Sequence, residues 1–285
     1  MKKRYYEYWG AQSPVFVNER APGSLFWSSE LRNLFDEILQ WTSVSGRVIS
    51  VVGESGSGKT SFVREIYHCY PHEWDVSVSI VTGWETDPLW LMGSLARFFG
   101  GDEESWRDPD IQLQIVQQGI EQLHEEGRHL LLLLDGVERL QRSDDLNVLR
   151  DIQELCGHSF SVLLVGQINP YEQIDRKYEL SPWTLEVVEQ AILWCLKQSH
   201  LENIKIHDDM MQVLFERSAG FPGPLMRLAE GALITGSMCQ AKVWAPELIP
   251  TDHIDQSIAI KKKKRVREPV AKVFEKNKKG PSGRG

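Results

Sequence analysis

The sequence contains the segment Gly53-Glu54-Ser55-Gly56-Ser57-Gly58-Lys59-Thr60. This segment fits the pattern G-x-x-x-x-G-K-[ST], in which glycines let a loop fold back until its backbone N–H groups and the next helix face phosphate oxygens. In this pattern Lys59 reaches the β- and γ-phosphates and Thr60 coordinates Mg²⁺. Together with Ser61, which follows it, the segment predicts a site for a nucleoside triphosphate and its magnesium ion.

The flanks of this loop favour a phosphate site over an ordinary flexible Gly/Ser loop. Residues 47–52 are mostly apolar and predict a strand, and residues 60–70 predict a helix that Pro71 stops. Upstream, Ser28 and Ser29 are candidate N-caps of an amphipathic helix. The order strand, glycine loop, helix is the context that the motif requires.

Downstream of the loop, predicted strands and helices alternate. Strands are expected at 76–81, 129–134 and 161–165, and helices at 89–99, 111–124 and 147–156. This alternation predicts an α/β fold with one parallel sheet and right-handed crossovers. Because strand 76–81 intervenes in sequence, we expect another strand to lie between the loop strand and strand 129–134.

The pattern changes after Pro182. Residues 185–199, 208–218 and 223–234 read as three helices without strands. We therefore predict a phosphate-binding αβα domain at 1–182, a helical domain at 183–260 and a separate tail at 261–285.

Polar side chains follow two of the apolar strands, at the sheet edge where α/β folds bind ligands. Asp135 ends the run Leu130–Leu134 and is a candidate second oxygen ligand for Mg²⁺ beside Thr60, although an ordinary Asp-Gly turn is the alternative. Gln167 and Asn169 follow the next strand. Either of them is placed to contact a γ-phosphate or a water, and a plain turn is an equally good interpretation for each.

Composition narrows the class of protein. The chain has 285 residues, 41% of them hydrophobic, which suffices for a large core and excludes a disulfide-stapled miniprotein. The longest aliphatic run is Leu130–Leu134, too short to span a membrane. The N-terminus lacks the apolar core of a secretion signal, and the four cysteines form no Cys-x-x-Cys pair. These features predict a cytoplasmic protein without a transmembrane segment.

Charge is distributed unevenly along the chain. Residues 261–285 hold 11 Lys and Arg against 2 Asp and Glu, whereas residues 1–260 hold 21 against 38. A tail of this composition cannot bury a core. One hypothesis is that the tail is an electrostatic arm for DNA, RNA or anionic lipid. The alternative is that it only increases solubility or folds onto the acidic body.

The motifs taken together resemble a family. The phosphate loop, the aliphatic run ending in Asp135, Leu164-Val165-Gly166-Gln167 and Gly220-Phe221-Pro222 opening a helix are similar to AAA+ ATPases of the ExeA kind, which are related to transposition ATPases of the TniB/TnsC kind. The aromatic opening also resembles that family, in which it packs near the adenine; it comprises Tyr5–Gly10, Val15-Phe16 and Leu25-Phe26. The resemblance implies a nucleotide-binding αβα sandwich with a helical lid, ATP and Mg²⁺ as cofactors, and assembly into rings or filaments.

Three positions depart from that family. Gly136 stands where the family has a glutamate that activates water, which leaves Glu138 as the candidate replacement. Gly223 stands at the arginine position of the lid, which leaves Arg227 one helical turn away. Gln173 stands where the trans-acting arginine finger is expected, and Arg176 is the nearest arginine.

These departures predict firm ATP binding and slow hydrolysis. The leading hypothesis is a nucleotide switch that oligomerises with ATP, engages DNA through the tail or the pore of the oligomer, and recruits a partner enzyme such as a transposase. The first alternative is an assembly ATPase of a secretion or pilus system that works on a protein partner. The second is a signalling or defence module that binds ATP without hydrolysing it.

Overall fold

The computed structural model describes residues 4–16, 25–44, 46–69, 76–81, 89–101, 108–139, 154, 160–168 and 174–250. The predicted helix 147–156 lies outside these residues except for residue 154, and the candidates Asn169 and Gln173 and the basic tail lie outside them entirely. Within the described part of the chain, no helix is long and apolar enough to cross a membrane.

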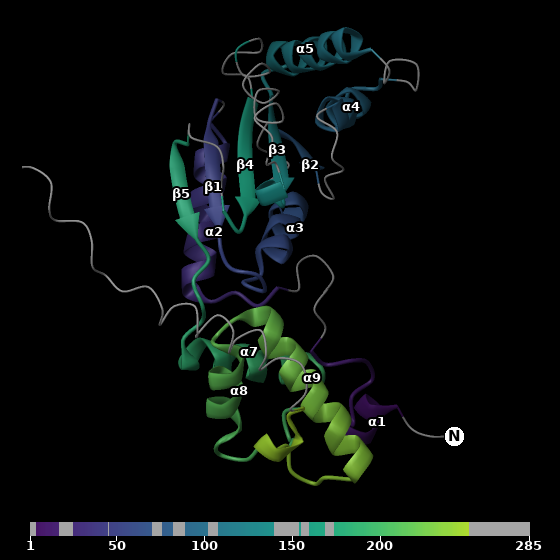
Figure 1. Cartoon of the computed structure of the whole chain (residues 1–285), viewed down its shortest axis with the longest axis vertical. Helices are drawn as coiled ribbons and strands as arrows, with labels where there is room; N and C mark the ends of the chain where they lie inside the picture. The colour runs from purple at the N-terminus through teal and green to yellow at the C-terminus, as the bar shows by residue number, and fades with distance from the viewer. Residues whose placement is uncertain are drawn as a thin grey trace, which may run out of the picture. The chain divides into compact units, whose positions relative to one another are not determined.

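A five-stranded parallel sheet forms the centre of the first domain, with the strand order β2-β3-β4-β1-β5 (Figure 1). Its strands are β1 (Val48–Val52), β2 (Val76–Val81), β3 (His129–Asp135), β4 (Phe160–Gly166) and β5 (Arg176–Glu179). The parallel α/β prediction is confirmed. A strand does lie between β1 and β3, but it is β4, whereas β2 occupies the sheet edge. The strand that lies between them in space is thus not the one that lies between them in sequence.

Helices cover both faces of the sheet. One face carries α4 (Leu89–Phe98) and α5 (Pro109–Glu125), which pack on Leu130, Leu132 and Leu134 of β3. The other face carries α2 (Ser29–Thr42) and α3 (Lys59–Cys69), which pack on Leu131 and Leu133. Because successive residues of a strand point to opposite faces, one continuous apolar run supplies both cores, as a doubly covered strand requires.

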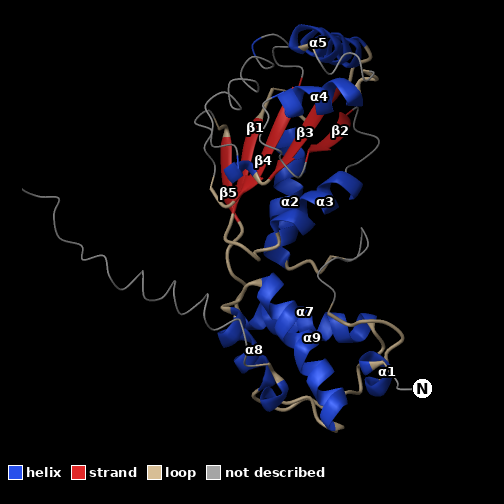
Figure 2. Ribbon diagram, turned by 45° about the vertical axis from the view of Figure 1, so that its right-hand side comes forward, coloured by secondary structure: helices blue, strands red, loops and turns tan. Residues whose placement is uncertain are grey.

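The helical domain contains α7 (Leu185–Gln198), α8 (Met210–Ser218) and α9 (Pro222–Cys239), followed by a short 3₁₀ helix, Pro246–Leu248 (Figure 2). Thr184 caps α7 by accepting from the Val187 N–H, and α9 runs five residues beyond the predicted end at Ile234. Among the described residues of this part of the chain, Ile206 and Trp244 form one isolated parallel bridge and no strand is present.

The aromatic N-terminal segment packs on the helical domain. Helix α1 (Tyr5–Trp9) lies beside α9, where Trp9 Nε1 donates to the Leu233 carbonyl at 2.8 Å. The Glu230 carboxylate accepts from the Phe16 N–H at 2.9 Å and from the Tyr5 hydroxyl. Burial raises the pKa of Glu230, and the backbone donors act in the opposite direction. This segment thus belongs structurally with the lid.

Candidate nucleotide site

The phosphate loop joins β1 to α3 and is shaped by its glycines. Gly56 and Gly58 have φ values of +85° and +93°, which side-chain-bearing residues rarely adopt. Lys59 Nζ donates to the carbonyls of Gly53 at 2.7 Å and Glu54 at 2.8 Å. Burial lowers the pKa of Lys59, while the negative charges of Glu138 and Asp135 oppose that shift. The ammonium therefore lies in a half-buried site with two carboxylates close by.

The two candidate magnesium ligands meet at the carboxyl end of the sheet. Thr60 Oγ1 donates to Asp135 Oδ2 at 2.8 Å, although 75 positions separate the two residues. Thr60 is the second residue of α3, which follows the loop after β1, and Asp135 ends β3. Hydroxyl and carboxylate oxygens are the kind of ligand that Mg²⁺ takes from a protein, so this donor set fits the ion.

The chain turns sharply after Asp135. Val137 is buried within the short 3₁₀ helix Val137–Arg139, and Glu138 Oε2 accepts from the backbone N–H of Gln167 at 3.0 Å. A Cβ on Gly166 would overlap the Glu138 carboxylate, so the glycine makes room for it. Glu138 is therefore turned back toward the ends of β3 and β4, as a replacement for a glutamate at position 136 requires.

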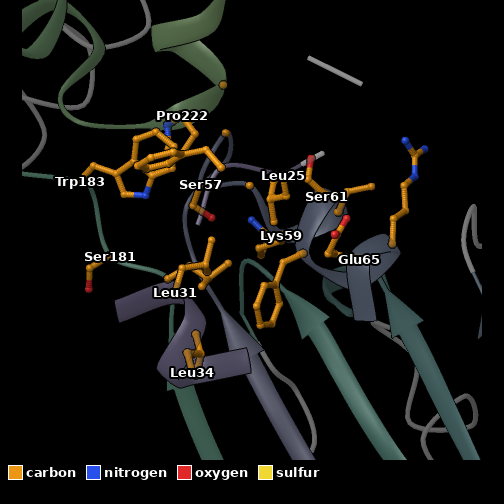
Figure 3. Close-up of a pocket in the computed structure, with 18 of the residues that line it drawn as sticks. Leu25, Leu31, Leu34, Ser57, Lys59, Ser61, Glu65, Ser181, Trp183 and Pro222 are labelled. Atoms are coloured by element: carbon orange, nitrogen blue, oxygen red, sulfur yellow. The ribbon is translucent and has the colours of Figure 1, made fainter. Parts of the chain in front are cut away.

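One cavity of about 1120 Å³ contains nearly all of these groups. It is lined by residues 55–61 of the loop and helix start, by Asp135, Glu138 and Gln167, and by Arg227 of α9. Figure 3 shows Lys59 and Ser61 on one side of Ser57, and Trp183 and Pro222 on the other. The structure thus brings together the predicted residues of the loop, the two acids, the glutamine and the lid arginine.

Some predicted site residues lie elsewhere. Gly53 and Glu54 do not line the cavity, and their carbonyls hold Lys59 instead. Arg176 is also outside it, because it pairs with Ile49 near the start of β1 and its guanidinium lies 4.7 Å from the centre of the Trp41 ring. Of the aromatic opening, only Leu25 and Phe26 line the cavity. The expectation that Tyr5–Phe16 packs near the base is wrong, since this segment rests on α9.

Two tryptophans in the cavity wall were not predicted. The ring of Phe26 meets Trp183 at 5.6 Å and Trp194 at 6.0 Å between centroids. Trp183 directly follows Pro182 at the predicted domain boundary. Its position at that boundary could have marked it as a candidate cavity residue. Trp194 lies within α7, where the helical pattern does not distinguish it from a packing residue.

Comparison with known proteins agrees with this geometry. Residues 43–174 match the family profile described as AAA domain. Among solved structures, the chain is similar to Cdc6p from Pyrobaculum aerophilum, at 17% identity and a TM-score of 0.64 over 82% of this chain and 68% of that one. It is also similar to Orc1 from Aeropyrum pernix in complex with DNA, at 14% identity and a TM-score of 0.56 over 91% and 70%. A RuvB variant from Thermotoga maritima matches at 15% identity and a TM-score of 0.51 over 86% and 73%.

No curated protein sequence matches the chain significantly. Residues 43–174 are therefore similar to the AAA domain family, and the chain shares the α/β fold of the Cdc6p structure. The expected resemblance to ATPases of the ExeA or TniB/TnsC kind is not confirmed by these matches.

Proposed function

We propose that this protein is an ATP-binding AAA+ switch with slow hydrolysis, which oligomerises, engages DNA and recruits or licenses a partner enzyme. The observation that carries the proposal is the 2.8 Å contact between Thr60 and Asp135 beside Lys59. When Mg²⁺·ATP is bound, the ion neutralises charge on the triphosphate and fixes its geometry. Thr60 and Asp135 would hold that ion, and the loop amides and Lys59 would hold the phosphates.

Slow hydrolysis is supported by the positions of the candidate catalytic groups. Glu138 is the nearest carboxylate that could accept a proton from water, but one of its oxygens is engaged by the Gln167 N–H. The position expected for the trans-acting arginine finger holds Gln173, and the nearest arginine, Arg176, is stacked on Trp41. Where an arginine finger has been measured, it contributes about 10³ to 10⁵ in rate, so its displacement leaves slow turnover.

Engagement of DNA is supported by two independent features. The similar Orc1 structure is a complex with DNA, and residues 261–285 carry a strong excess of Lys and Arg. An acidic body repels a polyanion, so contact through the tail or within an oligomer is the favoured arrangement.

The test is a combined binding and turnover assay on the full chain. We expect ATP to bind in the presence of Mg²⁺, turnover on the order of one per minute or slower, and larger assemblies when a slowly hydrolysed ATP analogue and duplex DNA are both present. Lys59→Ala should lose ATP binding. Rapid turnover by the isolated monomer, or full ATP affinity in Lys59→Ala, would contradict the proposal.

One alternative has a specific observation in its favour. Gly136 and the engaged Glu138 carboxylate also suit a module that binds ATP and never hydrolyses it. The same assay separates the two: no turnover with any DNA, despite firm ATP binding, favours the module.

A further inference from the structure

A backbone contact joins the lid directly to the phosphate loop. The N–H of Gly223, in the first turn of α9, donates to the carbonyl of Gly56 at 2.9 Å. Both glycines line the cavity, and Figure 3 shows Pro222 of α9 next to Ser57 of the loop. The lid helix therefore rests on the middle of the loop expected to wrap the phosphates.

This close approach requires glycine at position 56 and leaves room for a side chain at position 223 only in a tight contact. A Cβ on Gly223 would lie 3.1 Å from Gly56 Cα and 3.2 Å from Gly56 O. These are backbone atoms, which cannot swing away as the end of a side chain can. A Cβ on Gly56 would lie 2.8 Å from Pro224 Cδ, and the positive φ of Gly56 disfavours a side chain in any case.

The contact is made by a peptide group that also faces the loop interior. The Gly56 carbonyl and the Ser57 N–H belong to one planar unit, and this N–H donates to the Glu54 carbonyl at 3.1 Å. Lys59 Nζ donates to the same Glu54 carbonyl at 2.8 Å. If a phosphate draws Lys59 and the loop amides toward itself, the plane rotates and the acceptor of the Gly223 N–H moves with it.

We propose that Gly223 is a positioning residue that couples the lid to the state of the phosphate loop. Its missing side chain lets α9 sit on the Gly56 peptide, so that occupation of the loop by phosphates is transmitted to the first turn of the lid helix without a side chain. This inference rests on the proposed ATP binding, and it assigns a route by which ATP would switch the lid.

Amide hydrogen exchange on the full chain tests this coupling. In the wild type, saturation with a slowly hydrolysed ATP analogue and Mg²⁺ should change exchange in residues 222–226 by about fivefold or more. In Gly223→Ala, at an analogue concentration that saturates this variant in its own titration, the change in that segment should fall below about twofold. Gly93→Ala is the matched control, because a Cβ on Gly93 of α4 meets its nearest atom, Gln112 Nε2, at an ordinary 3.7 Å. It should behave as the wild type does.

The outcomes separate the coupling from the proposed function. An equal analogue-induced change in Gly223→Ala and the wild type overturns the coupling and leaves ATP binding intact. Should Gly223→Ala fail to fold, the wild type still decides: a first turn of α9 whose exchange ignores the bound analogue overturns the coupling. No analogue binding to the wild type at all defeats the proposed function, and the coupling with it.

Discussion

Thr60 and Asp135 meet because each follows the carboxyl end of a parallel strand. Parallel strands end at the same sheet edge, so residues far apart in sequence converge there. The pair was predictable from the motif and the aliphatic run alone. The direct hydrogen bond between them shows that the two oxygens already lie close enough to share one ion.

Replacing Thr60 tests this pair. Thr60→Ala should weaken the binding of Mg²⁺·ATP by about 10- to 100-fold, because one oxygen ligand and its link to Asp135 are lost. ATP binding in the presence of a chelator should change little, since Lys59 and the loop amides remain. Thr235→Ala, which removes a hydroxyl bonded only to its own helix at Gly231, is the control. The comparison is made by calorimetric titration, and an unchanged magnesium dependence would remove Thr60 from the site.

For Glu138, the sequence predicted a candidate role but not the direction of the side chain. The motif pattern made Glu138 the candidate replacement for the missing base. The direction of its side chain depends on how the chain turns after Asp135. Burial of Val137 and the space left by Gly166 set that turn. Contacts of this kind join residues that are far apart in the sequence, so no local sequence pattern predicts them.

Glu138→Gln separates a catalytic from a structural role. Gln keeps an oxygen that can accept the Gln167 N–H, so ATP affinity should be preserved. Turnover should fall by about 100-fold if Glu138 accepts the proton of the attacking water. Glu121→Gln, in an exposed pair on α5, serves as the control. Equal turnover in wild type and Glu138→Gln would leave the carboxylate with a structural role only.

At the scale of elements, apolar runs and helix caps in the sequence predicted most of the strands and helices. Strands β1, β3 and β4 and the helices of the lid appear within a few residues of their predicted positions. Strand β5 was missed, because Arg176–Glu179 is short, polar and exposed on the sheet edge. It is extended because it pairs with β1, and this tertiary cause leaves no periodic signal in four residues.

The packing of α1 on α9 depends on a glycine of the lid. A Cβ on Gly236 would lie 2.5 Å from Trp9 Cζ2 and 3.1 Å from Leu248 Cδ1. Gly236→Ala should therefore displace α1 and lower the free energy of unfolding by about 1–3 kcal/mol, the usual cost of overpacking. Gly93→Ala should be neutral or slightly stabilising. Urea unfolding followed by tryptophan fluorescence measures both, and equal midpoints for the two variants would contradict the packing described for Trp9.

At the scale of the whole molecule, the parallel sheet and the helices that follow it in sequence were predictable, whereas the contacts between them were not. The Gly56–Gly223 contact joins two glycines that in the sequence indicate only a loop and a helix start. No sequence pattern predicts that they meet. Phe26, Trp183 and Trp194 likewise come from three different parts of the chain and share one wall. Such contacts follow from the packing of complete elements, so they appear only in three dimensions.

Deleting residues 261–285 tests the electrostatic arm at this same scale. The deletion removes a net charge of +9 from an otherwise acidic chain, so DNA affinity should drop and its dependence on salt should become shallower. Each phosphate contact contributes about 0.9 to the slope of log affinity against log salt, so a loss of four contacts lowers the slope by about 3 to 4. ATP affinity should be unchanged, because the deletion keeps every described residue that lines the nucleotide cavity, from Leu25 to Arg227. Fluorescence anisotropy at about 50 and 200 mM salt measures this slope. Equal affinity of the deleted and full chains at both concentrations would exclude the arm and leave contact within an oligomer as the route to DNA.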